Sequence, residues 1–181
     1  MSKKRLSHAI YVESGPPAAS SVAQIARSEG LREVNLEVGD VADQEALEAR
    51  IASVFKIPYR FRGLDAAISL MADLDWLPSQ AGYCLLVSGL DDCPEPVAAD
   101  TAGILPDVID RWRSGTVPFV AVLACASSRS VVLRAVRDSN QFLADAGNRE
   151  WNASEIGPVP IIVDGVPEPM PEASDEPPAT G

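Results

Sequence analysis

Three polar side chains lie one helical turn apart in a segment whose other side is apolar: Asp65, Ser69 and Asp73. Residues four apart share one face of a helix, so these three are expected to project from the same side. Carboxylates fixed on a helix form charge-assisted hydrogen bonds with Lys and Arg and can take the place of phosphates in a basic cleft. The spacing therefore points to a surface that binds a basic protein.

A loop of alternating aromatic and basic residues precedes this helix: Tyr59-Arg60-Phe61-Arg62, closed by Gly63. Tyr59 and Phe61 are candidate contact residues, because interface hot spots favour aromatic side chains. For Phe61 we favour a role in anchoring the loop to the core. Arg60 and Arg62 have a second interpretation, which is pairing with neighbouring aspartates. Asp65 likewise fits a favourable charge in the first turn of the helix as well as it fits a partner contact.

The sequence offers little to an enzyme. Its one histidine, His8, has no acid or nucleophile beside it, and Ser14-Gly15-Pro16-Pro17 lacks the Gly-Lys-Ser/Thr ending of a phosphate loop. No metal-ligand spacing is present. Carboxylates alone also serve acid–base or Mg²⁺ chemistry, so a carboxylate-dependent enzyme stays as an alternative. We predict a protein that is not an enzyme and needs no cofactor or metal.

Composition limits the partners. The 181 residues carry a formal net charge of -11, which repels nucleic acid and attracts basic surfaces. Cys84, Cys93 and Cys125 are widely spaced and odd in number, as in reduced intracellular proteins, and we expect Cys84 and Cys125 to be buried. The apolar run after Lys3-Lys4-Arg5 is too short for a secretory signal, and no run is long enough to cross a membrane. We therefore expect a cytoplasmic protein that binds neither nucleic acid nor membrane directly.

Apolar patterning supplies the elements that must position the helix and loop. Continuous or alternating apolar runs predict strands at residues 9–12, 34–38, 83–87 and 119–123, and less clearly at 160–163. Helical spacing predicts helices that begin near Ser20 and Asp43, a third over residues 64–74, one that ends near Trp112, and a weaker one over 132–143. Residues 91–100 read as an acidic loop. This alternation predicts an α/β fold with a small, mainly parallel sheet flanked by helices.

The segment Ile57-Pro58-Tyr59-Arg60-Phe61-Arg62-Gly63-Leu64-Asp65-Ala66-Ala67, which continues through Met71-Ala72-Asp73-Leu74-Asp75-Trp76-Leu77-Pro78, resembles the barstar family of ribonuclease inhibitors. The strand at Tyr83, the helix that ends in Trp112 and the strand opened by Pro118-Phe119 also fit that family. The resemblance covers about residues 31–124.

The resemblance implies a compact α/β inhibitor that plugs a ribonuclease active site with acidic side chains of this loop and helix. By position, Asp65 matches the acidic residue at the start of the inhibitory helix, and Asp110 roughly matches a further acidic contact. Ser69 stands where the family's inhibitors usually carry a second aspartate. Arg60, Arg62 and Gly63 also depart from the family's loop. Either the target differs or the contacts have moved, for instance to Asp73, Asp75 or the Asp91-Asp92 loop.

The sequence predicts four segments along the chain and one main function, with one alternative. We expect an N-terminal strand–helix extension over 1–30 packed on the domain, a barstar-like core over 31–124, a helix/strand extension over 125–163 and a disordered acidic, Pro-rich tail over 164–181. The predicted function is an immunity protein or antitoxin that binds a basic nuclease toxin 1:1 and occludes its active site. The alternative is a barstar-like module that binds another basic partner without inhibiting it.

Overall fold

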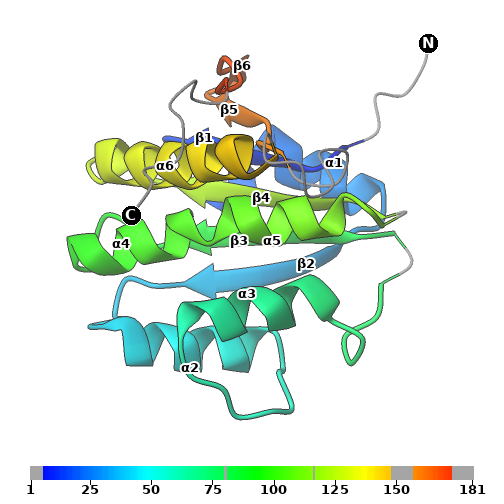
Figure 1. Ribbon diagram of the computed structural model, residues 1–181, viewed down its shortest axis with the longest axis vertical. Coiled ribbons are helices and arrows are strands. Elements are labelled where there is room, and N and C mark those ends of the chain that lie inside the picture. The colour runs from blue at the N-terminus through cyan, green and yellow to red at the C-terminus, as the bar shows by residue number, and fades with distance from the viewer. Residues whose placement is uncertain (1–5, 80, 116, 148–156, 173–181) are drawn as a thin grey trace, which may run out of the picture.

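One six-stranded sheet runs through the molecule (Figure 1). The computed structural model describes residues 6–79, 81–115, 117–147 and 157–172. The strands are β1 (Ala9–Glu13), β2 (Arg32–Glu37), β3 (Tyr83–Ser88), β4 (Phe119–Ala124), β5 (Ile161–Val163) and β6 (Val166–Pro167). Their order is β2-β3-β4-β1-β5-β6, and every pairing is parallel except that of β5 with β6. The mainly parallel α/β sheet expected from the alternating apolar runs is confirmed.

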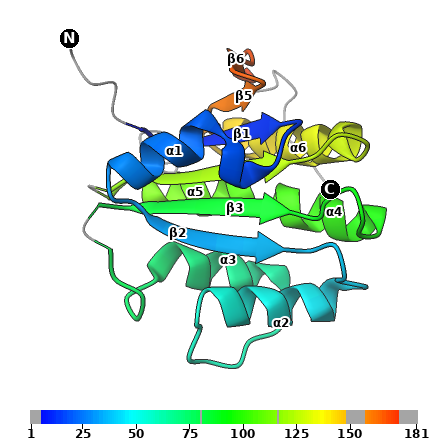
Figure 2. The same cartoon turned by 180° about the vertical axis from the view of Figure 1, so that it is seen from behind.

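Helices cover the two faces of this sheet unequally. The helix α1 (Ser21–Ser28), preceded by a 3₁₀ turn at Pro17–Ala19, packs on one face. The remaining helices pack on the other face: α2 (Gln44–Val54), α3 (Leu64–Asp73), α4 (Glu95–Gly103), α5 (Leu105–Trp112) and α6 (Arg129–Gly147). Figure 2 shows α1 lying over the central strands on its own side. Because β3 and β4 are buried on both faces, their sequences are continuously apolar.

Two helix starts follow the predicted capping. The Ser20 hydroxyl accepts hydrogen bonds from the backbone N–H groups of Val22 and Ala23 at the start of α1. At the start of α2 the Asp43 carboxylate accepts from Ala46 N–H at 2.9 Å. Each cap satisfies donors that the first turn of a helix leaves unpaired.

The acidic segment 91–100 was expected to be a loop, and that expectation is wrong for its second half. Residues Glu95–Gly103 form α4, with Pro94 as N-cap and Pro96 in the first turn. Proline suits this position because the first turn has no intrahelical partner for its N–H. Val97, Ala98 and Ala102 then bury one side of the helix in the main core.

The chain outside residues 31–124 completes the same sheet. β1 lies between β4 and β5, with Ile10 in register with Ala121 on one side and Ile161 on the other. The longer α6 covers the main face, and β5 adds the next strand. The N-terminal and C-terminal segments therefore share one hydrophobic core with β2, β3 and β4.

Residues 164–172 have defined structure, contrary to the disorder that we expected from Asp164 onward. A turn at Asp164-Gly165 leads into β6, and Glu168 forms an ion pair with Arg137 of α6. The Asp164 carboxylate pairs with Arg129 at 2.6 Å. Ion pairing to α6 thus holds a segment whose composition alone suggested a free tail. The rest of the expected tail, 173–181, lies outside the described residues.

Candidate protein-binding surface

The loop before α3 leaves α2 through an irregular backbone. Lys56 has φ +52°, in the left-handed region, and Gly63 has φ +86° immediately before α3. Glycine adopts such a conformation without the steric cost of a Cβ. The intervening Tyr59, Arg60 and Arg62 are exposed, whereas Phe61 is half-buried against the main core. The role of Phe61 as the anchor of this loop is therefore consistent with its packing.

Trp76 fastens the other end of this region. Its indole Nε1–H donates to the carbonyl of Phe55 at 3.0 Å, which joins the segment after α3 to the end of α2. The Tyr59 ring meets the Trp76 ring edge-on, with ring centroids 5.8 Å apart, a favourable geometry for aromatic pairs. Tyr59 is nevertheless 61% exposed, so most of its surface faces solvent. An aromatic side chain held in one orientation and left exposed is suited to contact a partner.

The buried side of α3 is tied to its surroundings by two further aromatic donors. Trp112 at the end of α5 donates from Nε1 to the Met71 carbonyl at 3.0 Å. The Tyr83 hydroxyl donates to the Leu77 carbonyl at 2.6 Å, just after α3. Ala67 and Met71 are fully buried beneath these contacts. α3 is therefore a rigid support for whatever its outer face presents.

Asp65, Ser69 and Asp73 lie on that outer face and are exposed, as their spacing predicted. Within the described residues the Asp65 and Asp73 carboxylates have no hydrogen bond or ion pair. Asp65 occupies the first turn of α3 without capping it through its side chain, so only the favourable helix-terminus charge remains of the capping interpretation. Both carboxylates are available to a partner.

Ser69, between the two aspartates, is engaged differently. Its hydroxyl donates to the Asp65 carbonyl at 3.0 Å and accepts from Arg111 Nη1 of α5 at 3.2 Å. Arg111 also pairs with Asp107 one turn earlier at 3.1 Å. The Arg111 guanidinium therefore lies at the middle of the outer face of α3, between Asp65 and Asp73. Arg111 was not predicted to lie on this surface, although its i,i+4 spacing from Asp107 was a signal of a paired, partly fixed side chain.

Asp110 does not belong to this surface, although the resemblance placed it there. The residue is only 6% exposed, and its carboxylate accepts from Gly157 N–H at 3.1 Å and pairs with Arg113. Burial raises the pKa of Asp110, against the lowering effects of the Gly157 hydrogen bond and Arg113. Asp110 connects α5 to the segment before β5, a structural role that no pattern within the family-like region could reveal.

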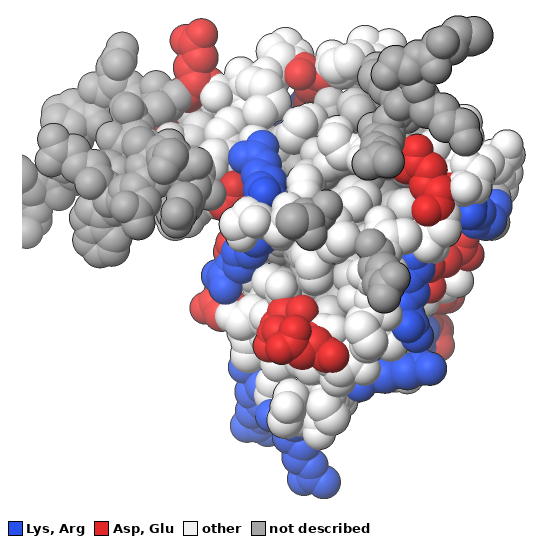
Figure 3. Space-filling view, turned by 90° about the vertical axis from the view of Figure 1, so that its right-hand side faces the viewer, with Lys and Arg blue, Asp and Glu red and all other residues white. Residues whose placement is uncertain are grey.

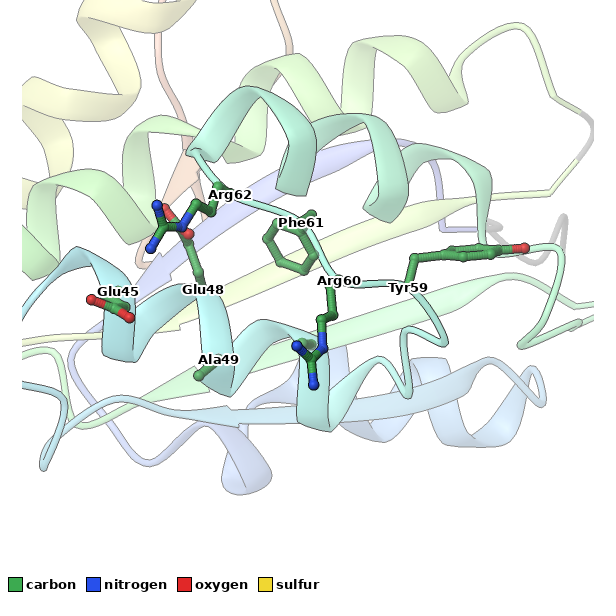
Figure 4. Close-up of a pocket in the computed structure, with 8 residues that line it drawn as sticks. Glu45, Glu48, Ala49, Tyr59, Arg60, Phe61 and Arg62 are labelled. Carbon is green, nitrogen blue, oxygen red and sulfur yellow. The ribbon is translucent and has the colours of Figure 1, made fainter.

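Arg60 and Arg62 line an open pocket of about 700 Å³ between the loop and α2. Glu45, Glu48 and Ala49 form the facing wall (Figure 4). In the described part of the chain neither arginine makes a hydrogen bond or ion pair, so their expected pairing with neighbouring aspartates is not present. Figure 3 shows basic side chains gathered at the lowest part of the molecule and an acidic cluster directly above. The face of the molecule seen in this view therefore carries side chains of both signs of charge.

The described residues offer no cluster of three or more His, Cys, Asp or Glu able to hold a metal. His8 Nδ1 accepts from Phe119 N–H, and burial, together with Arg113, lowers the pKa of this imidazole. Burial raises the pKa of the Cys84 thiol to about 12 and that of Cys125 to about 11. Both cysteines are buried and unpaired, as predicted, and such thiols are unreactive.

The fold and this surface define an α/β domain that presents a fixed aromatic, two arginines and two free aspartates from one loop and the following helix. A family model described as Barstar (barnase inhibitor) matches residues 31–124, slightly more than half of the chain. The protein therefore belongs to the barstar family. The matched region runs from just before β2 to the end of β4 and includes the loop, α3 and α5.

The other comparisons add limits. No curated protein matches the chain. Among the helices of the described residues, none combines the length and apolar character that crossing a membrane requires.

Proposed function

We propose that this protein is an inhibitor that binds a basic nuclease toxin, with a ribonuclease as the favoured target, and occludes its active site. One observation carries the proposal: the loop and helix of a barstar-family domain present an exposed Tyr59 and, on a rigid support, exposed Asp65 and Asp73 whose carboxylates have no hydrogen bond or ion pair among the described residues. The complex is 1:1 and needs no cofactor, and the protein acts as a cytoplasmic immunity protein or antitoxin rather than as an enzyme. It contacts neither nucleic acid nor membrane directly.

The physical basis is substitution of phosphates by carboxylates. A nuclease cleft holds the phosphates of its substrate with Lys and Arg, and carboxylates held on a helix form the same kind of charge-assisted hydrogen bonds with those side chains. Because α3 is already held by Trp112 and Tyr83, little conformational entropy is lost when Asp65 and Asp73 are engaged. The net charge of -11 adds a long-range attraction for a basic partner, which salt weakens.

A second function has one observation in its favour. Arg111 bonds Ser69 midway between Asp65 and Asp73, so the outer face of α3 does not present a continuous row of carboxylates. This arrangement favours a barstar-like module that binds some other basic protein without blocking a nuclease. The two functions differ in whether the captured partner has an activity and whether that activity is lost in the complex.

Affinity capture separates these functions. The full chain is immobilised and incubated with lysate and secreted protein of its native host, beside the double variant Asp65→Arg, Asp73→Arg. A matched control is Asp92→Arg, Asp138→Arg, which makes the same charge change at two exposed aspartates outside α3. The inhibitor proposal expects wild type and control to recover a nuclease with suppressed activity and the α3 variant to lose it. Recovery of a partner without nuclease activity supports the second function instead.

A further inference from the structure

The pocket beside the proposed surface has walls of opposite charge. α2 contributes Glu45 and Glu48, and the loop contributes Arg60 and Arg62. Glu48 is nearly buried, and its carboxylate accepts from Gln44 Nε2 at 2.7 Å. Glu48 is thus held in place, whereas Glu45 is exposed and both arginines extend from an exposed loop toward solvent.

The two arginines are placed differently along this pocket. In Figure 4 the Arg62 guanidinium lies on the side of Glu45 and Glu48, whose charges compensate it at longer range. Arg60 points to the other end, on the side of Ala49 and away from both glutamates. Arg60 therefore has an apolar wall beside it and, within the described residues, no carboxylate partner. An arginine with an unused planar fork of donors is suited to bind a carboxylate through two hydrogen bonds.

We infer that Arg60 receives an acidic side chain of the nuclease that the neighbouring α3 face binds, and that Arg62 adds positive charge at the other end of the pocket. This inference rests on the proposed function and names a further requirement of the same partner: an Asp or Glu at the rim of its basic cleft. A uniformly basic rim would meet Arg60 and Arg62 with like charge, which disfavours the complex. The two arginines then act as a specificity filter, accepting basic clefts with an acidic rim and rejecting others.

A protein carboxylate fits this position better than a nucleic acid phosphate. A polynucleotide would bring many negative charges against Glu45, Glu48 and Asp65 and against a chain of net charge -11. A single carboxylate, placed by the surrounding interface, meets Arg60 without exposing further negative charge to those residues. The half-buried Phe61 and the exposed Tyr59 on either side of Arg60 supply apolar contact around the ion pair.

Charge reversal tests the sign of the partner surface. The variants are Arg60→Glu, Arg62→Glu and the neutral Arg60→Gln, and the control is Lys56→Glu, an exposed basic residue of the same loop that does not line the pocket. The protein partners recovered from the host extract by each full-length variant are identified, and the affinity for the recovered nuclease is measured by titration at fixed salt. Arg60→Glu is expected to weaken binding about ten- to hundredfold, as for loss of a charge-assisted contact. Arg60→Gln is expected to give an intermediate loss, and Arg62→Glu and Lys56→Glu smaller ones.

The outcomes separate the two proposals. Equal or tighter binding of the nuclease by Arg60→Glu shows a basic or neutral surface opposite the pocket and overturns this inference, while the inhibitor function stands. An equal loss with Lys56→Glu shows a general charge effect and also overturns it. Failure of the wild type to recover any nuclease overturns the proposed function and this inference together. Ordered losses of Arg60→Glu over Arg60→Gln over Lys56→Glu support the acidic rim.

Discussion

Asp91 joins the family-matched region to the helix that follows it, and replacing it is expected to weaken the fold measurably. Its carboxylate accepts from the backbone N–H of Ala126 at 2.8 Å and of Ser128 at 2.8 Å, and from the Ser128 hydroxyl at 2.7 Å. α6 begins at the next residue, so the carboxylate also lies at the favourable end of that helix dipole. The substitution Asp91→Asn keeps the shape but removes the charge and one acceptor oxygen.

The size of the effect follows from the pKa of this carboxyl. Burial alone would raise the pKa of Asp91, but the hydrogen bonds from Ser128 and Ala126 outweigh it and lower the pKa from 3.8 to about 2. Transferred in full, that shift would correspond to about 2.5 kcal/mol, at about 1.4 kcal/mol per pKa unit. Asp91 is exposed, and solvent screening reduces such interactions, so we expect a loss of about 1 kcal/mol. In a chain of this length that loss lowers the Tm by about 2–4 °C.

Thermal and urea unfolding of Asp91→Asn beside Asp92→Asn measures this effect. Asp92 is an exposed neighbour whose carboxylate has no hydrogen bond or ion pair in the described residues, so its substitution makes the same charge change with little loss of stability. Because the folded-state pKa of Asp91 is lowered, its contribution is present above about pH 4 and is lost as the pH falls toward 2. At about pH 3, roughly half of the gap between wild type and Asp91→Asn is expected to remain. Equal losses in both variants, or a gap that does not narrow in acid, would refute the reasoning.

Three further predictions concern the supports of the site and of the sheet. Tyr83→Phe removes the buried hydrogen bond to Leu77 and is expected to cost about 1–2 kcal/mol in urea unfolding, whereas Tyr59→Phe, which removes an exposed hydroxyl, is expected to cost almost nothing. A comparable loss from the two substitutions would contradict the assigned role of the Tyr83 hydroxyl. Asn140→Ala leaves both the N–H and the carbonyl of Val159 without their partner and is expected to lower the free energy of unfolding by about 2–4 kcal/mol. Amide hydrogen exchange in β5 is expected to become faster. Unchanged exchange in that strand would contradict the role given to Asn140. The pKa of the only histidine, His8, is expected to lie below 6.5 when measured by NMR, because burial and Arg113 disfavour the charged imidazole. Folding stability is then expected to fall as the pH drops below about 6.5. A measured pKa at or above that value would show that His8 is not held as described.

The elements that hold the site were predictable where side-chain periodicity alone decides them. The buried strands Tyr83–Ser88 and Phe119–Ala124 and the outward row Asp65, Ser69 and Asp73 follow from apolar runs and four-residue spacing. α4 was missed because Pro94 and Pro96 read as loop residues, although proline is favoured at the start of a helix. Local pattern does not distinguish these two uses of proline.

Contacts between distant segments were not predictable from one sequence. The family resemblance placed Asp110 on the surface, but its carboxylate accepts a hydrogen bond from the backbone N–H of Gly157, 47 residues away. The anchoring of α3 by Trp112 and of the loop by Trp76 depends on backbone carbonyls, which leave no signal in the sequence. The pairing of Ser69 with Arg111 across 42 residues belongs to the same class.

The inhibitor function is tested most directly by titrating the captured nuclease with this protein and following its activity. We expect activity to fall linearly and to vanish at one equivalent of wild type, with Asp92→Arg, Asp138→Arg behaving the same way. The Asp65→Arg, Asp73→Arg variant is expected to leave the nuclease active at one equivalent. A complex in which the bound nuclease keeps its activity, or an α3 variant that inhibits as well as wild type, would contradict active-site occlusion through this helix.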